Sequence, residues 1–416
     1  MKMSEFEQLG KKAKEASRVL NLLTSKRKND ILLEFADILE ENTPKILLEN
    51  QKDTQNAKEN GINEVMIDRL KLTPERIADM AQGIRQVASL KDPIGAFDSL
   101  WVNEDNLRIG KQRVPLGVVG MIFESRPNVT TDAASLCFKT GNAVILRGGK
   151  EAIHSNKVLV EVMREVLLKN DLPAACISLI EDTTRKSTQE MLTGNDYLDV
   201  LIPRGGAGLI RAVRQNATVP VIETGTGNCH IYVHEDADLN KAIEIIINAK
   251  TQRPSVCNAM ETLVVHEKIA PILLPRLEDR LQEWNVELRA DDFSRNYLKN
   301  SLVATQEDYE TEFLDYILAI KSVSSLEEAI EHINQFSTQH SESILSNDYA
   351  ATQKFLREID SACVYVNAST RFTDGFVFGF GAEIGISTQK LHARGPMGLE
   401  ALTSIKYVIY GEGQIR

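Results

Sequence analysis

Short apolar runs alternate with helix-like segments from residue 118 onward, and this alternation constrains the fold more than any other feature of the chain. Strand-like runs lie at 118–123, 143–147, 177–180, 200–202 and 219–222. Amphipathic segments separate them at 131–139, 155–168, 187–192 and 208–215. Several of the runs are apolar on both faces, as in a parallel sheet that helices cover on both sides. The pattern predicts an α/β fold built on a parallel sheet.

The segments on either side of this region extend the pattern. Residues 3–92 are helical in periodicity, and Thr43-Pro44 and Thr73-Pro74 are typical of an N-cap followed by proline at the first helical position. Residues 93–117 predict a β-hairpin with Asp105-Asn106 at its turn. A helix at 238–250 leads into a second β/α region from 262 to 367. Its predicted strands lie at 262–266, 286–289, 316–323, 343–345 and 364–367, and its predicted helices at 269–282, 325–335 and 349–358.

Composition excludes several classes of function. The 416-residue chain has a net charge of −11, which disfavours binding to nucleic acid or to anionic membranes. Its five cysteines are odd in number and never spaced as C-x-x-C, which argues against a disulfide framework or a zinc site. His230 and His234 lie on a strand-like run, about 13 Å apart, so no metal bridges them. The sequence shows no signal peptide and no apolar run of spanning length, so we expect a cytoplasmic protein.

Cys257 lies between an apolar helix-like run and the strand-like run at 262–266. A thiol at such a junction can sit near a helix N-terminus, where free amides favour the thiolate. Arg253, four residues upstream, would add positive potential. An isolated cysteine is more often buried and inert, so this segment by itself leaves both interpretations open.

Two glycine-rich loops follow strands and precede helices. The first contains Arg147, Gly148 and Lys150, and the second contains Arg204, Gly205 and Gly206. Backbone amides at such turns can cradle phosphate, and ligands bind beyond the carboxyl ends of open α/β sheets. Neither loop has the G-x-G-x-x-G fingerprint, so a tight turn with a solvated basic residue remains the alternative.

Taken together, the motifs resemble those of the aldehyde dehydrogenase superfamily. The resemblance rests on Pro115-Leu-Gly-Val-Val-Gly, on Glu223-Thr-Gly-Thr-Gly-Asn, on Glu235-Asp-Ala-Asp, and on Ser255-Val-Cys257 at the position of the catalytic cysteine. Within it the chain is most similar to the gamma-glutamyl phosphate reductases. That similarity is carried by Phe123-Glu-Ser-Arg-Pro-Asn, Thr251-Gln-Arg-Pro-Ser-Val-Cys-Asn, Phe378-Gly-Phe-Gly-Ala-Glu-Ile-Gly and His392-Ala-Arg-Gly-Pro-Met-Gly.

The resemblance implies an NADPH-dependent enzyme of proline biosynthesis. It would reduce L-glutamyl 5-phosphate to glutamate 5-semialdehyde and release phosphate through a thioacyl-enzyme on Cys257. The implied domains are a Rossmann-type NADPH-binding domain (1–97 and 118–250), an α/β catalytic domain (251–385), and an oligomerisation element (98–117 and 402–416). A lone hairpin is marginally stable, so we expect a homo-oligomer. A transient contact with glutamate 5-kinase would protect the labile acyl phosphate.

The resemblance also implies roles for individual residues. The Cys257 amide and either Ser125 or Asn128 would stabilise the oxyanion; Asn128 as a helix N-cap is the alternative. Glu223 matches the general base of hydrolytic relatives. The substrate's phosphate and carboxylate would be bound by Arg126, Arg253 and Arg371. Cofactor contacts would come from Arg147, Gly148, Lys150, Arg204, Gly205, Gly206 and Gly225, with Arg147 and Lys150 near the 2′-phosphate.

Two other functions remain open at this point. A hydrolytic, non-phosphorylating aldehyde dehydrogenase would use Glu223 as the base that activates water. A non-enzymatic scaffolding protein of the crystallin type would have kept the fold and lost the chemistry. Both would lack the phosphate dependence that the resemblance implies.

Overall fold

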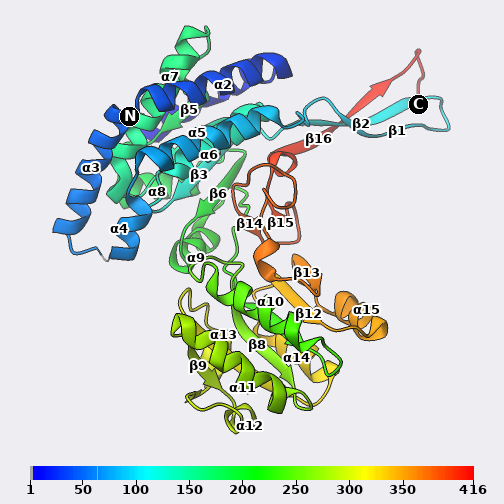
Figure 1. The fold of residues 1–416 in the computed structure, drawn as a ribbon. Coiled ribbons are helices and arrows are strands. Elements are labelled where there is room, and N and C mark those ends of the chain that lie inside the picture. The colour runs from blue at the N-terminus through cyan, green and yellow to red at the C-terminus, as the bar shows by residue number, and fades with distance from the viewer. Residues whose placement is uncertain (1–2, 63) are drawn as a thin grey trace. The chain divides into compact units, whose positions relative to one another are not determined.

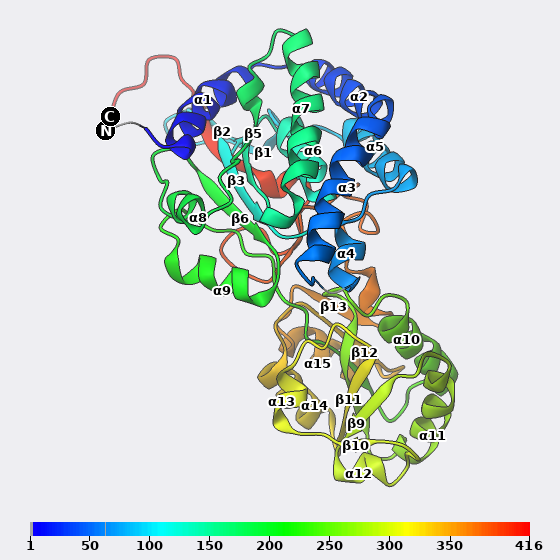
Figure 2. The same cartoon turned by 90° about the vertical axis from the view of Figure 1, so that its left-hand side faces the viewer.

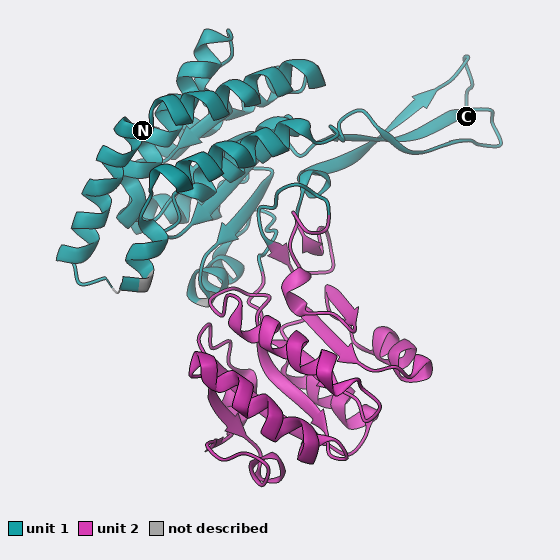
Figure 3. Ribbon diagram, viewed as in Figure 1, with its two compact units in different colours: residues 1–224, 379–385, 397–416 teal, residues 225–378, 386–396 magenta. Residues whose placement is uncertain are grey.

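The computed structural model describes residues 3–62 and 64–416 and divides into two compact units (Figure 3). Unit 1 comprises Met1–Thr224, Gly379–Gly385 and Met397–Arg416, and unit 2 comprises Gly225–Phe378 and Ile386–Pro396. The division falls at Gly225, whereas the sequence predicts a boundary at 251. The helix predicted at 238–250 therefore folds with the Cys257 segment rather than with the first sheet. No helix in the described ranges is long and apolar enough to cross a membrane.

Unit 1 is built on a four-stranded parallel sheet in the order β5-β4-β3-β6 (Figure 2). Its strands are β3 (Val118–Phe123), β4 (Ala143–Arg147), β5 (Ile177–Leu179) and β6 (Val200–Arg204). The helices that alternate with them are α6 (Asn128–Lys139), α7 (Ile153–Lys169), α8 (Arg185–Leu192) and α9 (Ala207–Asn216). Every residue of β3 is buried, as expected for a strand covered on both faces. The predicted α/β fold is confirmed.

The strand predicted at 219–222 is wrong. The structure has only a single bridge there, between Leu201 and Val221. Pro220 lies inside the segment and has no N–H to donate to a ladder, which explains why the pairing does not extend.

Among the described residues before the sheet, the helices are α1 (Glu5–Leu20), α2 (Ser25–Glu41), α3 (Thr43–Glu59), α4 (Glu64–Leu70) and α5 (Pro74–Ser89). Thr73 caps α5 as predicted, because its side chain accepts a hydrogen bond from the Arg76 amide. The prediction for Thr43 is wrong by one residue: Asn42 is the N-cap and makes no side-chain cap bond, so Thr43 is already helical.

The predicted hairpin exists and pairs with the C-terminal strand. β1 (Phe97–Val102), β2 (Arg108–Pro115) and β16 (Thr403–Tyr410) form an antiparallel sheet in the order β1-β2-β16 (Figure 1). Asn106 takes a positive φ of 58° in the turn, a conformation that asparagine tolerates. In Figure 1 this sheet extends away from the helices of unit 1. Apolar side chains such as Leu100, Val102 and Tyr407 are more than half exposed on it.

Unit 2 is built on a seven-stranded parallel sheet in the order β10-β9-β11-β8-β7-β12-β13. Its strands are β7 (Cys229–Val233), β8 (Met260–His266), β9 (Glu287–Ala290), β10 (Leu302–Val303), β11 (Ile317–Val323), β12 (Ser341–Leu345) and β13 (Cys363–Val366). Its helices are α10 (Leu239–Thr251), α11 (Ala270–Leu281), α12 (Asp292–Arg295), α13 (Gln306–Glu310), α14 (Leu326–Phe336) and α15 (Tyr349–Glu358). A short pair, β14 (Ile386–Ser387) with β15 (Gly395–Pro396), completes the unit.

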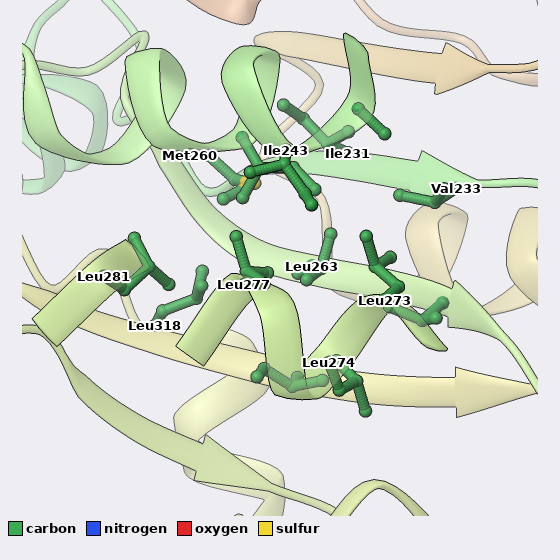
Figure 4. Close-up of a cluster of buried hydrophobic side chains, with 14 of the residues drawn as sticks. Ile231, Val233, Ile243, Met260, Leu263, Leu273, Leu274, Leu277, Leu281 and Leu318 are labelled. Carbon is green, nitrogen blue, oxygen red and sulfur yellow. The ribbon is translucent and has the colours of Figure 1, made fainter. Parts of the chain in front are cut away.

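The core of unit 2 fixes the two elements on either side of Cys257. Side chains of α10 and α11, including Ile243 and Leu277, pack against Leu263 of β8 and Ile231 of β7 (Figure 4). These residues are at most 4% exposed. Because α10 and β8 are both anchored in this core, the loop that joins them has fixed ends.

Candidate active site

Cys257 lies in the loop that connects α10 to β8. The loop follows the C-terminal end of α10 at Thr251 and ends where β8 begins at Met260. The thiol therefore follows the C-terminal end of a helix. The loop gives no support to the prediction that a helix N-terminus stabilises the Cys257 thiolate. The residue is neither fully buried nor exposed. It differs in this from Cys137, Cys176 and Cys229, which are buried.

Asn258, the residue after the cysteine, ties the loop to the segment 370–373. Its carbonyl accepts a hydrogen bond from Thr370 Oγ1 at 2.8 Å. Its side-chain Nδ2 donates to the carbonyl oxygens of Thr373 at 2.8 Å and Arg371 at 3.3 Å. These three bonds hold the predicted substrate-binding residue Arg371 against the Cys257 loop.

Arg371 and Arg253 gather positive charge around Cys257. Burial lowers the pKa of Arg371, the nearby charge of Arg253 lowers it further, and the charge of Cys257 opposes both effects. Arg371 Nε also donates to Gln252 Oε1 at 3.2 Å, so a loop side chain orients the guanidinium. Arg253 is exposed. Two of the three predicted substrate arginines therefore share unit 2 with the cysteine, and Arg126 belongs to unit 1.

Of the two predicted oxyanion donors, Ser125 is already engaged. Its hydroxyl donates to Glu151 Oε1 at 2.6 Å, and its amide donates to the same oxygen at 2.9 Å. The residue is 5% exposed and has a positive φ of 36°, a strained conformation that this carboxylate stabilises. Ser125 therefore has no free proton to offer an oxyanion.

Asn128 is exposed and keeps a donor. It is the first residue of α6 rather than its N-cap, which is Pro127, and no side chain caps this helix. One N–H of its amide donates to Asp132 Oδ2 at 3.0 Å. Burial raises the pKa of Asp132 to about 6, while the Asn128 bond and the charge of Arg204 oppose the shift. The second N–H of the amide group makes Asn128 the better of the two oxyanion candidates.

The first glycine loop leaves one basic side chain exposed at the end of β4. Arg147 donates through Nη2 to the carbonyl oxygens of Thr183 at 2.9 Å and Thr184 at 3.3 Å, so its guanidinium supports a neighbouring loop. Burial lowers the pKa of Arg147. Lys150 is exposed. A methyl group on Gly148 would lie 2.0 Å from Asn156 Nδ2, so a larger residue there would have to displace the Asn156 side chain.

A carboxylate occupies the second glycine loop. Gly206, the N-cap of α9, donates its amide to Glu124 Oε2 at 2.8 Å. A methyl group on Gly205 would lie 2.5 Å from the same oxygen. An amide that binds a carboxylate at a helix N-terminus is suited to an anion, since the helix dipole favours negative charge. Arg204 precedes this turn. The exposed cation of Lys150 and this anion-binding turn, both at the carboxyl ends of parallel strands, fit a phosphorylated dinucleotide.

Glu223 and Gly225 lie on either side of the division between the units. Glu223 Oε1 is 3.8 Å from Nε of Arg214, which is 74% exposed, so water screens this ion pair. Gly225 belongs to unit 2 and donates its amide to the Ile386 carbonyl at 2.9 Å, which leaves no N–H for a cofactor.

Several residues around these groups were not anticipated from the sequence. Asn258, Glu151, Glu124 and Glu312 each hold a functional segment through hydrogen bonds. Asn258 and Glu124 lie within motif stretches that carry the family resemblance, whereas Glu151 and Glu312 had no sequence signal. Within residues 3–62 and 64–416, no three His, Cys, Asp or Glu side chains gather as metal ligands.

Comparison with known proteins assigns the chain to a family. The sequence profile of the aldehyde dehydrogenase family matches residues 1–295 and 305–408. The chain is 61% identical to the gamma-glutamyl phosphate reductase of Enterococcus faecalis over 416 residues, covering 100% of both chains. The identity to the enzyme of the same name from Listeria innocua is 59% over 414 residues, again covering 100% of both.

The fold agrees with this assignment. The crystal structure of the gamma-glutamyl phosphate reductase of Thermotoga maritima superposes with a TM-score of 0.97 at 50% identity, covering 99% of this chain and 100% of that chain. An acetylating aldehyde dehydrogenase from Geobacillus thermoglucosidasius, at 19% identity and a TM-score of 0.70, shares the fold. The chain therefore belongs to the aldehyde dehydrogenase family, in the branch of the gamma-glutamyl phosphate reductases.

Proposed function

We propose that this protein reduces L-glutamyl 5-phosphate to glutamate 5-semialdehyde with NADPH and releases inorganic phosphate, with Cys257 as the nucleophile. The observation that carries the proposal is the full-length identity of 61% to a gamma-glutamyl phosphate reductase, together with the two arginines beside the Cys257 loop. An acyl phosphate bearing an α-carboxylate brings two anionic groups, and guanidinium forks are the side chains best suited to bind them.

In the first step, Cys257 Sγ attacks the acyl carbon of the substrate. The oxygen that develops negative charge would be stabilised by two hydrogen-bond donors, the Cys257 amide and the second N–H of the Asn128 side chain. The bond between the acyl carbon and the phosphate oxygen then breaks, phosphate leaves, and a thioester on Cys257 remains. Arg253 neutralises charge on the departing phosphate, and Arg371 orients the amino-acid carboxylate.

NADPH, when bound, supplies the hydride that converts the thioester to the oxidation level of the aldehyde. Lys150 and the Gly205-Gly206 turn would hold its phosphate groups. A phosphate at this turn would replace the Glu124 carboxylate as the acceptor of the Gly206 amide. In the last step Cys257 Sγ leaves as a thiolate and the semialdehyde is released. No step requires activated water, so Glu223 has no obligatory role as a base and its carboxylate shapes the site.

We also propose that the chain acts as a homo-oligomer through the sheet β1-β2-β16. Its exposed apolar side chains lie on the two outer strands, β1 and β16, among them Leu100 at 54%, Val102 at 59% and Ile409 at 54%. Exposed apolar patches of this kind mark association surfaces. Glutamate 5-kinase remains a proposed transient partner that would deliver the labile substrate directly.

The experiment runs the reaction in reverse, with glutamate 5-semialdehyde, NADP⁺ and phosphate, and follows NADPH formation. Cys257→Ala is expected to abolish turnover, whereas Cys176→Ala, a buried cysteine of unit 1, is expected to keep it. Wild-type turnover that survives in Cys257→Ala would refute the assignment of the nucleophile. Failure of the wild type with this substrate would refute the proposed reaction.

A further inference from the structure

The main-chain carbonyl of Cys257 is held by two residues of the segment 227–229, which leads into β7. The Cys229 thiol donates a hydrogen bond to that oxygen, with Sγ 3.1 Å away. Gly227 packs against the same oxygen so closely that a methyl group on its Cα would lie 1.4 Å from it. Any side chain at 227 would therefore displace the peptide of the nucleophile.

The strands that flank this contact depart from regular pairing at the same point. Cys229 pairs with Met260, but His230 pairs with Thr262, so Glu261 is the extra residue of a β-bulge in β8. Bulges re-aim side chains and occur preferentially next to active sites. This one begins directly after the Cys257 loop and opposite the residue whose thiol contacts the Cys257 carbonyl.

The segment that carries this contact is itself firmly held. The Gly227 amide donates to Glu312 Oε1 at 2.6 Å. Asn228, which is fully buried, donates through Nδ2 to the carbonyl oxygens of Tyr309 at 2.7 Å and Phe336 at 2.9 Å. Three residues of unit 2, Glu312, Tyr309 and Phe336, thus fix the position from which Cys229 contacts the Cys257 carbonyl.

Cys229 keeps its proton and so remains a donor. It is fully buried, and burial, followed by the negative charge of Glu342, raises the pKa of the Cys229 thiol well above its ordinary value. The thiol is therefore unsuited to act as a second nucleophile. Nδ1 of His340 is a second polar neighbour of the thiol, 3.7 Å from Sγ, and it also lies 2.8 Å from Ser341 Oγ.

We propose that Cys229 is a positioning residue for catalysis: its S–H···O bond to the Cys257 carbonyl, with Gly227 packed on the same oxygen, fixes the backbone of the residue that carries the nucleophilic sulfur. The catalytic consequence rests on the proposed function, because that residue supplies the nucleophile and, through its own amide, an oxyanion donor. Loss of the bond lets the peptide move, and a displacement of about 1 Å at a reacting centre costs on the order of 100-fold in rate.

The test compares Cys229→Ala, which removes the donor, with Cys229→Ser, which keeps a donor in nearly the same place. Cys176→Ala is the matched control, since Cys176 is also buried but belongs to unit 1. Two readouts are measured: kcat and KM of the reverse reaction, and the rate at which iodoacetamide alkylates Cys257, followed by mass spectrometry. The Tm of each variant is recorded, and Cys229→Val replaces the alanine variant if the latter does not fold.

Cys229→Ala is expected to lower kcat roughly 10- to 100-fold with KM little changed, and to change the alkylation rate of Cys257 by a similar factor. Cys229→Ser is expected to recover most of both, and Cys176→Ala to match the wild type. Wild-type values for Cys229→Ala, or a serine variant no better than alanine, would overturn the proposal. The alkylation comparison needs no substrate, so it tests the positioning even if the wild type fails to oxidise the semialdehyde.

Discussion

The buried ion pair between Lys250 and Glu261 joins the two ends of the Cys257 loop and gives a sharp prediction for stability. Both side chains are fully buried, and Lys250 Nζ lies 2.5 Å from Glu261 Oε2. The other carboxylate oxygen accepts a hydrogen bond from the Leu314 amide at 3.1 Å. The desolvation cost of such a pair rivals its Coulomb attraction, so the pair adds little net stability, while one partner left alone is strongly unfavourable.

The expected magnitudes follow from that asymmetry. Lys250→Met leaves a buried carboxylate without its counter-ion and should cost about 3–5 kcal/mol, which lowers Tm by roughly 6–20 °C for a unit of this size. Replacing both partners by apolar residues, as in Lys250→Met with Glu261→Leu, should return the stability to within about 1 kcal/mol of the wild type or above it. The interaction between the two substitutions is therefore large and favourable.

The loss of unfolding free energy caused by Lys250→Met should also depend on pH. Burial raises the pKa of Glu261 to about 7, while Lys250 opposes the shift. Because this pKa exceeds that of the unfolded chain, the stabilising contribution of Glu261 is complete below about pH 4.5 and is lost as the pH rises through about 7. Without Lys250 the pKa rises further, so the variant should lose less stability at pH 5.5 than at pH 8.5.

Thermal unfolding by circular dichroism, on the wild type, both single variants and the double variant at these two pH values, measures all of this. A single variant that unfolds within 2 °C of the wild type would refute the argument. A double variant as unstable as the single variants would also refute it. That result would show that the ion pair contributes net stability that apolar packing does not replace.

Three further predictions concern the site and the assembly. Arg371→Met should raise KM for the semialdehyde roughly 10- to 100-fold with a smaller change in kcat, since a charged hydrogen bond is worth about 1.5–3 kcal/mol; an unchanged KM in steady-state kinetics would remove Arg371 from the substrate site. Lys150→Met should lower the ratio of kcat/KM for NADP⁺ over NAD⁺ about 10-fold or more, and an unchanged ratio would exclude a contact with the 2′-phosphate. Trp101→Glu, which places a charge beside Tyr407 on the exposed sheet β1-β2-β16, should yield monomers in light scattering; a retained oligomer would place the interface elsewhere.

Much of the fold was predictable because the strands of unit 1 are buried on both faces. β3 and β4 begin and end where the apolar runs do, at 118–123 and 143–147. The hairpin also followed from sequence pattern, whereas its partnership with the C-terminal strand followed from the family resemblance. The division at Gly225 was not predictable, because periodicity identifies α10 but does not say which sheet it packs on. That is decided by the contacts of Ile243 with β7 and β8.

Sequence alone proposes residues for the candidate site only where they lie close together in the chain or match a motif. Cys257, Arg253 and Arg371 are such residues. Hydrogen bonds between distant segments were not, and they change the assignments. Glu151 accepts the hydrogen bond of the Ser125 hydroxyl, 26 residues away in the chain. Cys229 donates a hydrogen bond to the Cys257 carbonyl, 28 residues away. Neither side chain carries a local signal, because its role exists only once the sheets have formed.

The phosphate dependence of the reverse reaction tests the central claim most directly. NADP⁺ reduction by glutamate 5-semialdehyde is measured while inorganic phosphate is raised from zero to saturation. An acyl-phosphate reductase requires phosphate to release the thioacyl-enzyme from Cys257, so we predict no steady-state turnover without phosphate and a saturable increase with it. Steady turnover that is indifferent to phosphate would contradict the account and would indicate a hydrolytic aldehyde dehydrogenase with Glu223 as its base.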